Sequence, residues 1–352
     1  MAPSVSILMP VYRAETTLAA AVDSVRRQTR EDWELWLCDD ASPDRCGALC
    51  EEFAAADGRI RVIHIPENHG PGPARNAALK EATGDYILMM DSDDVIDEDL
   101  LERALTALEE YGVQTAVFGM TEEFLAPDGT VTAKNPVTFP FTVCRTVDEV
   151  RETLIRLEAR TLFGYNTNKL YRREVLIENG ILSPGEPLYE DFFLNAAYAP
   201  HITSMVVLDT APYHYLKRGS GLTAQFVPRY FPLSRRRVAT VWEMYQNWDM
   251  ATEEVRRLLG GIYTRYIFSA LQRNCDPRMG LTRRERKAFL TGLYADPLFS
   301  DTVPYAAPEG RQMRLLHRLL NRRRTGLCLL AGRGLYVIKT RLPALFRRAS
   351  HT

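Results

Sequence analysis

The chain has 352 residues, of which 46% are hydrophobic and 25% charged, and a formal net charge of −1 at pH 7. This composition is typical of a globular protein and excludes a mainly disordered or fibrous chain, while the length suits about two domains. The charge is uneven: from Arg311 to the end there are eleven Lys and Arg and no Asp or Glu, so a basic tail follows a body with 33 basic and 45 acidic residues.

The first apolar run, Val5–Tyr12, has no basic segment before it, so we expect a buried strand and no signal peptide. No run approaches the ~20 apolar residues that a membrane-spanning helix needs. The six cysteines are scattered without the paired spacing of zinc ligands. We interpret them as reduced thiols of a cytoplasmic protein.

Strand-like runs alternate with helical periodicity over the first 120 residues. The predicted strands are Val5–Tyr12, Trp33–Cys38, Ile60–Ile65, Asp85–Met90 and Gln114–Gly119, and the predicted helices between them are Thr16–Arg27, Asp44–Ala56, Ala74–Ala82 and Asp97–Tyr111. This alternation predicts an α/β fold with a doubly wound, mostly parallel sheet. The loops that follow the strands should then line one edge, where such sheets bind ligands.

The rest of the chain is less regular and ends in helical periodicity. We expect a hairpin or flap over Thr121–Arg145, helices at Val147–Glu158 and Arg173–Asn179, a strand at Met205–Leu208, and helices beyond Val227 with loops near Asn274–Pro277 and Asp296–Pro308. The predicted organisation is one domain over 1–226, with halves 1–120 and 121–226. A helical C-terminal extension over 227–352 follows it.

Acidic residues stand where two predicted strands end: Asp39-Asp40 after one, and Asp91-Ser92-Asp93-Asp94 after another. Neither common glycine-rich phosphate motif is present. Carboxylates repel a diphosphate unless a divalent cation bridges the two, and hard oxygen ligands suit such a cation. One capping side chain would suffice for the following helix, so a run of four favours a metal site.

These acidic runs belong to a series of blocks that resembles glycosyltransferase family 2, with the GT-A fold. The blocks are Ser6–Tyr12, Asp39–Ser42, Glu67–Gly70 with Ala74–Asn76, Met90–Asp94, Asn168–Arg173, Tyr189–Asp191, and Tyr213–Tyr215 followed by Arg218–Ser220. The later blocks resemble its bacterial cell-surface polysaccharide branch. The resemblance covers about residues 4–223.

On the donor side, the resemblance implies roles for residues at the strand ends. Asp40 would accept the imide N–H of the nucleotide base, beside Pro10, Val11 and Tyr12. Arg75 would lie beside the base or the diphosphate.

The acidic run and a later loop would complete the donor and metal site by the same resemblance. Asp91 would face the ribose, with Ser92 beside it, and Asp93 would be the principal metal ligand. Arg218 and Ser220 would reach the diphosphate from a loop that closes over it.

His214 would be a second metal ligand by the resemblance, although a His between two tyrosines is also typical of a packed strand. On the acceptor side, Asp191 would be the general base and Glu190 would orient the acceptor hydroxyl. The alternative for Asp191 is a capping carboxylate at the start of a helix. Asn168 and Lys169 would brace this segment.

The implied activity is an inverting, metal-dependent glycosyl transfer that uses Mn²⁺ or Mg²⁺. The donor would be a nucleotide-diphosphate sugar, and Asp40 favours a UDP-sugar. The acceptor would be a glycan or lipid-linked glycan in cell-surface polysaccharide synthesis. Displacement from an anomeric carbon needs leaving-group stabilisation and a base for the hydroxyl, which these residue types supply.

Three other function classes fit the sequence less well. A nucleotidyltransferase would begin with a Gly-rich loop bearing Lys or Arg, which Pro10–Glu15 is not. A non-catalytic sugar-nucleotide or glycan-binding protein on the same fold would not need Asp93 and the Glu190-Asp191 pair. A nucleic-acid partner is not expected, because the chain has no recognisable binding module and an acidic body.

The basic tail places Leu and Met at helical spacing with Arg between them over Arg311–Arg324. Such an amphipathic segment predicts contact with an anionic membrane surface, and a peripheral location on the inner face of the cell membrane. The alternative is a C-terminal helix that packs on the protein and exposes a face of arginines.

Overall fold

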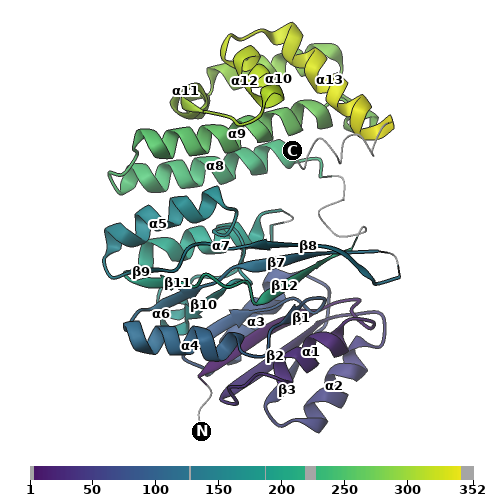
Figure 1. Ribbon diagram of the computed structural model, residues 1–352. Coiled ribbons are helices and arrows are strands. Elements are labelled where there is room, and N and C mark those ends of the chain that lie inside the picture. The colour runs from purple at the N-terminus through teal and green to yellow at the C-terminus, as the bar shows by residue number, and fades with distance from the viewer. Residues whose placement is uncertain (1–3, 127, 187, 219–226, 342–352) are drawn as a thin grey trace. The chain divides into compact units, whose positions relative to one another are not determined.

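The computed structural model describes residues 4–126, 128–186, 188–218 and 227–341, which fall into two compact units, 1–225 and 226–352. The N-terminal unit is α/β and the C-terminal unit is helical (Figure 1). The α/β fold class predicted from the sequence is confirmed. Within the described residues, every helix is too short or too polar to cross a membrane.

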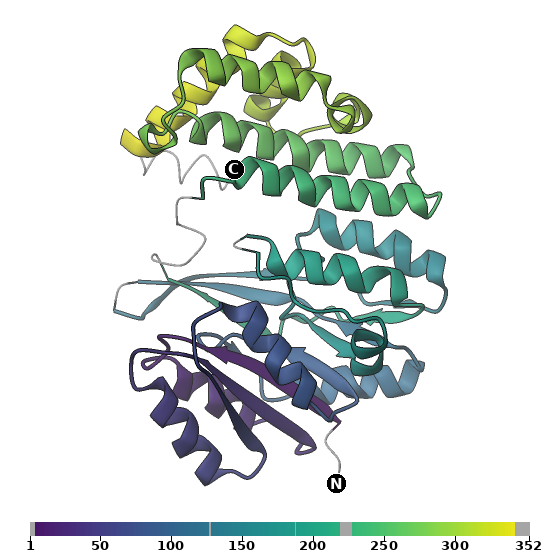
Figure 2. The same ribbon diagram turned by 180° about the vertical axis from the view of Figure 1, so that it is seen from behind.

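Strands and helices alternate at the start of the N-terminal unit. Their order is β1 (Val5–Val11), α1 (Leu18–Arg26), β2 (Trp33–Asp40), α2 (Cys46–Ala56), β3 (Ile60–Ile65), α3 (Pro71–Glu81) and β4 (Tyr86–Met89). The four strands pair in parallel in the order β3-β2-β1-β4. The chain thus reverses its direction across the sheet between β3 and β4, which puts α1 and α3 on opposite faces (Figures 1 and 2). A ligand crevice is expected where β1 and β4 diverge at their carboxyl ends.

The second half of this unit is mixed. It contains β5 (Val95–Ile96), α4 (Leu100–Tyr111), β6 (Thr115–Val117), β7 (Met120–Leu125), β8 (Val131–Val137), β9 (Thr142–Cys144), α5 (Val147–Ala159), β10 (Lys169–Arg172), α6 (Arg173–Glu178), α7 (Glu190–Tyr198), β11 (Met205–Val207) and β12 (Tyr213–Lys217). The main sheet continues as β4-β10-β6-β11-β9, and β10 runs antiparallel to both neighbours. A second sheet has the order β5-β12-β7-β8.

Burial explains why the central strands carry no polar alternation. All seven residues of β1 are buried, because helices cover both faces of the sheet. Ser6 is the polar member of this strand, and its hydroxyl donates to Glu34 at 2.6 Å. The sheet therefore holds the loops after β1, β2 and β4 on a rigid frame.

The C-terminal unit contains α8 (Tyr230–Asn247), α9 (Glu253–Arg273), α10 (Arg283–Ala295), α11 (Pro297–Thr302), α12 (Arg311–Asn321) and α13 (Thr325–Arg341). Thr252 caps α9, and a capping box of Thr282 and Glu285 starts α10. The last helices pack into this unit: α13 contacts α9 and α10, and α12 contacts α13.

Candidate active site

The acidic run after β4 forms a compact cluster. One carboxylate oxygen from each of Asp91, Asp93 and Asp94 lies within 4.8 Å of the others. The Asp91 side chain is 37% exposed and that of Asp93 53%, whereas Ser92 and Asp94 are buried. Two carboxylates of the cluster are therefore open to a ligand, and hard oxygens of this kind suit Mg²⁺ or Mn²⁺.

The Asp94 side chain is buried and binds to residues of β12. Its Oδ2 accepts the Tyr213 hydroxyl at 2.8 Å and its Oδ1 accepts the Leu216 N–H at 2.9 Å. Burial and the charges of Asp91 and Asp93 raise the pKa of Asp94 well above its ordinary value. Desolvation and the charge of Asp91 also raise the pKa of Asp93, against the effect of Arg218. Carboxylates crowded in this way fit a cation that would relieve their repulsion.

Arg75, on α3, joins this cluster to the acceptor side. Its side chain is 3% exposed and forms ion pairs with Asp91, with Glu190 Oε1 at 3.5 Å and with Asp191 Oδ1 at 3.6 Å. Burial acts to lower the pKa of Arg75, but the three carboxylates raise it. Three carboxylates thus surround the Arg75 guanidinium. Its place beside the base or the diphosphate stays a prediction.

Glu190 and Asp191 begin α7, after Tyr189 in the left-handed region at φ 64°. Desolvation raises the pKa of Glu190 to about 7 and the pKa of Asp191 to about 6, and Arg75 opposes both shifts. Protein atoms surround Asp191 closely, but 38% of its side-chain surface remains exposed. This combination is expected of a residue on the wall of an open site. A carboxylate with this pKa can accept a proton near neutral pH.

Gly72, at the start of α3, makes room for Glu190. A Cβ on Gly72 would lie 2.5 Å from Glu190 Oε1 and 2.7 Å from its Cδ. The flanking Pro71 and Pro73 have no N–H, so the Gly72 N–H is the donor that this first turn offers to the carboxylate. Gly72 was not predicted as a site residue; a glycine between two prolines at a helix start was the available signal.

Lys169 and Asn168 are buried beneath the acceptor side. Lys169 Nζ donates to the carbonyls of Leu162, Phe163 and Tyr165 and to Asn168 Oδ1, at 2.6–3.3 Å. Desolvation lowers the pKa of Lys169 to about 7. The Tyr165 carbonyl also accepts Asn195 Nδ2, which donates to the Asp191 carbonyl as well. This network ties the 162–169 loop to the first turn of α7.

The predicted base-binding residues lie at the carboxyl ends of β1 and β2. Pro10 and Val11 are buried, whereas Tyr12 is 41% exposed with the Arg13 guanidinium 5.3 Å from its ring centroid. Asp40 is buried, and its two oxygens accept the N–H groups of His69 and Gly70 at 3.0 and 2.8 Å. Asp40 therefore fixes the 68–70 loop that leads into α3.

Arg218 lies against the metal cluster. Its Nη1 is 3.3 Å from Asp93 Oδ2 and donates to the Asp93 carbonyl at 3.1 Å. Ser220, its predicted companion on a closing loop, lies outside the described residues. The structure thus places Arg218 beside the expected metal ligand.

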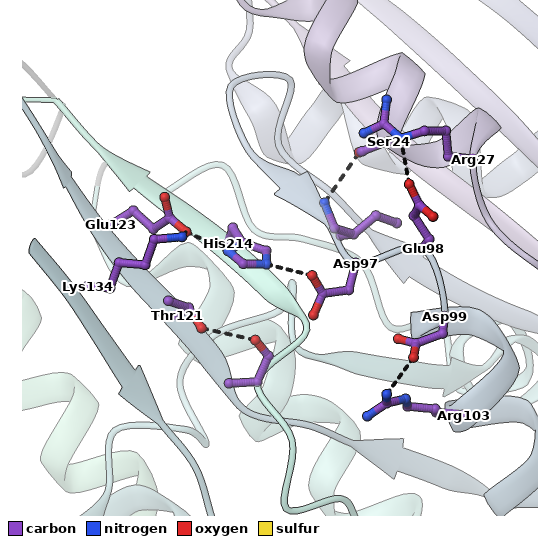
Figure 3. Close-up of polar contacts among 12 residues, drawn as sticks. Ser24, Arg27, Asp97, Glu98, Asp99, Arg103, Thr121, Glu123, Lys134 and His214 are labelled. Atoms are coloured by element: carbon purple, nitrogen blue, oxygen red, sulfur yellow. Dashed lines mark hydrogen bonds and ion pairs between the residues drawn. The ribbon is translucent and has the colours of Figure 1, made fainter. Parts of the chain in front are cut away.

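The structure does not bring His214 to the acidic cluster, and its role as a second metal ligand stays a prediction. His214 Nδ1 is 2.7 Å from Glu123 Oε1 and Nε2 is 2.9 Å from Asp97 Oδ1, so both ring nitrogens are engaged away from the cluster (Figure 3). The physical reason is strand alternation: on β12 the side chain of Tyr213 reaches Asp94, so that of the next residue points to the opposite face. The packed-strand alternative is the one observed.

Comparison with known proteins gives a family match to the N-terminal unit. Residues 6–180 match the model of the family Glycosyl transferase family 2. The chain is 30% identical over 230 residues to the uncharacterized glycosyltransferase EpsJ of Bacillus subtilis (strain 168), which covers 63% of this chain and 64% of that protein. It is 31% identical over 234 residues to the putative glycosyltransferase EpsH of the same organism, with 65% of each chain covered. The alignments therefore span slightly less than two thirds of these relatives.

The fold also matches a solved structure. The crystal structure of S. aureus TarS 1-349 in complex with UDP-GlcNAc aligns with a TM-score of 0.63 at 20% identity, over 96% of this chain and 91% of that one. At this level of identity the likeness concerns the fold.

Proposed function

Because residues 6–180 belong to glycosyltransferase family 2, we propose that this protein transfers a sugar from a nucleoside-diphosphate donor to an acceptor hydroxyl, with inversion at the anomeric carbon. One observation carries the proposal. The buried Arg75 guanidinium pairs with Asp91 of the acidic cluster and with Glu190 and Asp191. A leaving-group site and a candidate base are thereby held side by side.

Asp91 and Asp93 are the residues that would hold a divalent cation, Mn²⁺ or Mg²⁺. Such a cation, when bound, supplies charge stabilisation to the departing diphosphate. Arg218, beside Asp93, is placed to add a second positive charge to the same diphosphate. Tyr213 fixes the 91–94 loop, because its hydroxyl accepts the Asp91 N–H at 3.2 Å and donates to Asp94.

Asp191 is the proposed general base. Its carboxylate would accept the proton of the acceptor hydroxyl, while Glu190, fixed between Arg75 and the Gly72 backbone, would orient that hydroxyl. A base on one side of the reacting carbon and a leaving-group site on the other favour a single in-line displacement, which inverts the configuration.

The donor and acceptor are proposed by class. A UDP-sugar is favoured because Asp40, Tyr12 and the ends of β1 and β2 suit a uracil base, and because the TarS neighbour is a complex with UDP-GlcNAc. Ser220 and the loop it belongs to are expected to complete the diphosphate site. The acceptor is proposed to be a glycan or lipid-linked glycan of a cell-surface polysaccharide pathway, because the later sequence blocks resemble that branch of the family.

The C-terminal unit is proposed to meet an anionic membrane surface, with the protein on the cytoplasmic, inner face of the cell membrane and with no nucleic-acid partner. Leu315, Leu327 and Leu330 are 48–65% exposed, among arginines that are also exposed. All six cysteines, which lie within the described residues, are free, in keeping with a reducing compartment.

The direct test is to titrate the protein with UDP, with and without Mn²⁺, and then to screen UDP-sugars for UDP release. We expect Mn²⁺ to strengthen UDP binding and at least one donor to be hydrolysed slowly without an acceptor. Failure to bind any nucleoside diphosphate would refute the proposal. Metal-dependent binding with no turnover of any donor, alone or with acceptors, would support the non-catalytic binding protein instead.

A further inference from the structure

The C-terminal unit has a surface cavity of its own. It has a volume of about 510 Å³ and is lined by residues 306–308 and by one face of α12. The α12 residues that line it are Arg314, His317, Arg318 and Asn321, and Arg322, directly after the helix, completes the lining. Its lining includes no acidic residue.

Three arginines form a row along this cavity. Arg314, Arg318 and Arg322 follow one another at intervals of four residues, so they lie on one helix face over about 12 Å. All three are exposed, and none forms an ion pair within the described part of the chain. Like charges at this spacing repel one another, so an anion between them would stabilise the helix.

His317 and Asn321 contact each other on the same wall. His317 Nε2 lies 2.8 Å from the Val303 carbonyl and must donate to it, because a carbonyl oxygen only accepts. Nε2 then cannot accept from the Asn321 amide, 3.1 Å away, so the amide oxygen belongs at this contact. The other amide atom of Asn321, which is buried and has no partner, is then the NH₂ group.

We propose that this cavity binds the phosphate group of an anionic lipid. Guanidinium groups match phosphate oxygens with paired, charge-assisted hydrogen bonds. Leu315, which lies between the first two arginines of the row and is 55% exposed, would enter the apolar boundary beside the headgroup. This inference rests on the proposed membrane contact of the C-terminal unit and gives that contact a defined site, and it does not depend on glycosyl transfer.

The test uses the full chain and vesicles of phosphatidylcholine that contain either phosphatidic acid or an equal charge of oleate. The cavity variant is Arg314→Gln/Arg318→Gln/Arg322→Gln, and the matched control, Arg311→Gln/Arg324→Gln/Arg333→Gln, removes three exposed arginines that do not line the cavity. We expect the cavity variant to bind phosphatidic acid vesicles ~10-fold or more weakly than the control, because it loses phosphate hydrogen bonds as well as charge.

Equal losses in the two variants, or equal binding of the wild type to oleate vesicles, would show diffuse charge attraction and overturn the proposal. A soluble ligand is distinguished with inorganic pyrophosphate and Leu315→Asn. If the ligand is a lipid headgroup, Leu315→Asn weakens vesicle binding. If Leu315→Asn leaves vesicle binding unchanged, and pyrophosphate raises the melting temperature of the wild type but not of the cavity variant, the phosphate comes from solution. UDP release measured on the same preparations separates failure of this site from failure of the proposed transferase activity.

Discussion

Asp93 is the most exposed carboxylate of the cluster after β4, and its expected role is to bind the cation. We predict that Asp93→Ala lowers transfer to less than about a tenth of wild type, because a metal ligand contributes several kcal/mol in the transition state. UDP affinity in Mn²⁺ should fall as well, while the melting temperature stays the same. Asp128→Ala, at a fully exposed position, is the control. Activity above a tenth of wild type would exclude a metal-ligand role.

Asp191 is expected to contribute to turnover and not to donor affinity. Asp191→Asn keeps the shape of the side chain but cannot accept a proton, so we predict a ~10²–10⁴-fold fall in turnover. UDP binding, measured by calorimetry, should remain unchanged. The exposed Asp209→Asn serves as a control. A parallel collapse of UDP affinity would assign Asp191 to binding or to structure.

The same carboxylate predicts a pH dependence. A base works only when deprotonated, and the pKa of Asp191 is raised to about 6 and that of Glu190 to about 7. In a kcat/KM profile for donor turnover, activity should therefore rise with pH and reach half its maximum between about 6 and 7; the two groups titrate as a pair. A profile that stays flat down to about pH 5 would mean that the base has the ordinary pKa of an Asp.

How far single residues could be predicted depends on local geometry. Asp91 and the Glu190-Asp191 pair were expected at one site, and the structure brings them together around Arg75. The enclosure of Arg75 was not predicted, since it follows from packing between α3 and α7, far apart in sequence. His214 lies on β12, in line with the packed-strand alternative, but the side that a strand residue faces depends on the register, which the sequence alone does not give.

At the scale of elements, the alternating first half was predictable because the strands there are short and mostly apolar. The strands β5 and β10 were not predicted, and β12 was expected only as the packed-strand alternative for His214. These strands have two to five residues, and their pairing partners lie far away in the sequence. Tertiary pairing, more than local preference, decides strands of this kind. The mostly parallel sheet is accordingly mixed where β10 enters it.

The start of α3 gives a prediction about an element. Gly72→Ala would place a Cβ 2.5 Å from Glu190 Oε1, so the Glu190 carboxylate must leave its position or α3 and the first turn of α7 must move apart. We expect turnover to fall by about tenfold or more, because an active-site displacement of this size disturbs the acceptor geometry. Gly292→Ala, in α10 with open space around it, is the control and should leave turnover unchanged. Wild-type turnover in Gly72→Ala would mean that Glu190 moves without consequence.

For the whole molecule, the basic C-terminal segment left two alternatives open, a membrane-surface segment or a packed helix. The structure shows packed helices, and membrane contact stays a proposal. Leu320 and Cys328 are fully buried, so α12 and α13 belong to the core of the C-terminal unit, while Leu315 and Leu330 remain exposed. Sequence periodicity predicted the helices but could not distinguish the leucines that pack from those that stay exposed.

Two glycines of α13 provide a matched test of this packing. A Cβ on Gly332 would lie 2.9 Å from both the Cβ and the carbonyl oxygen of Leu271 on α9, whereas Gly334 has no atom within 4 Å of such a Cβ. Gly→Ala in a helix gains up to about 1 kcal/mol, but overpacking costs about 1–3 kcal/mol. We therefore expect Gly332→Ala to lower the melting temperature of the C-terminal unit by several degrees, and Gly334→Ala to keep or raise it. If α13 did not pack on α9, both substitutions would raise the melting temperature alike, and the C-terminal segment would be free of the core.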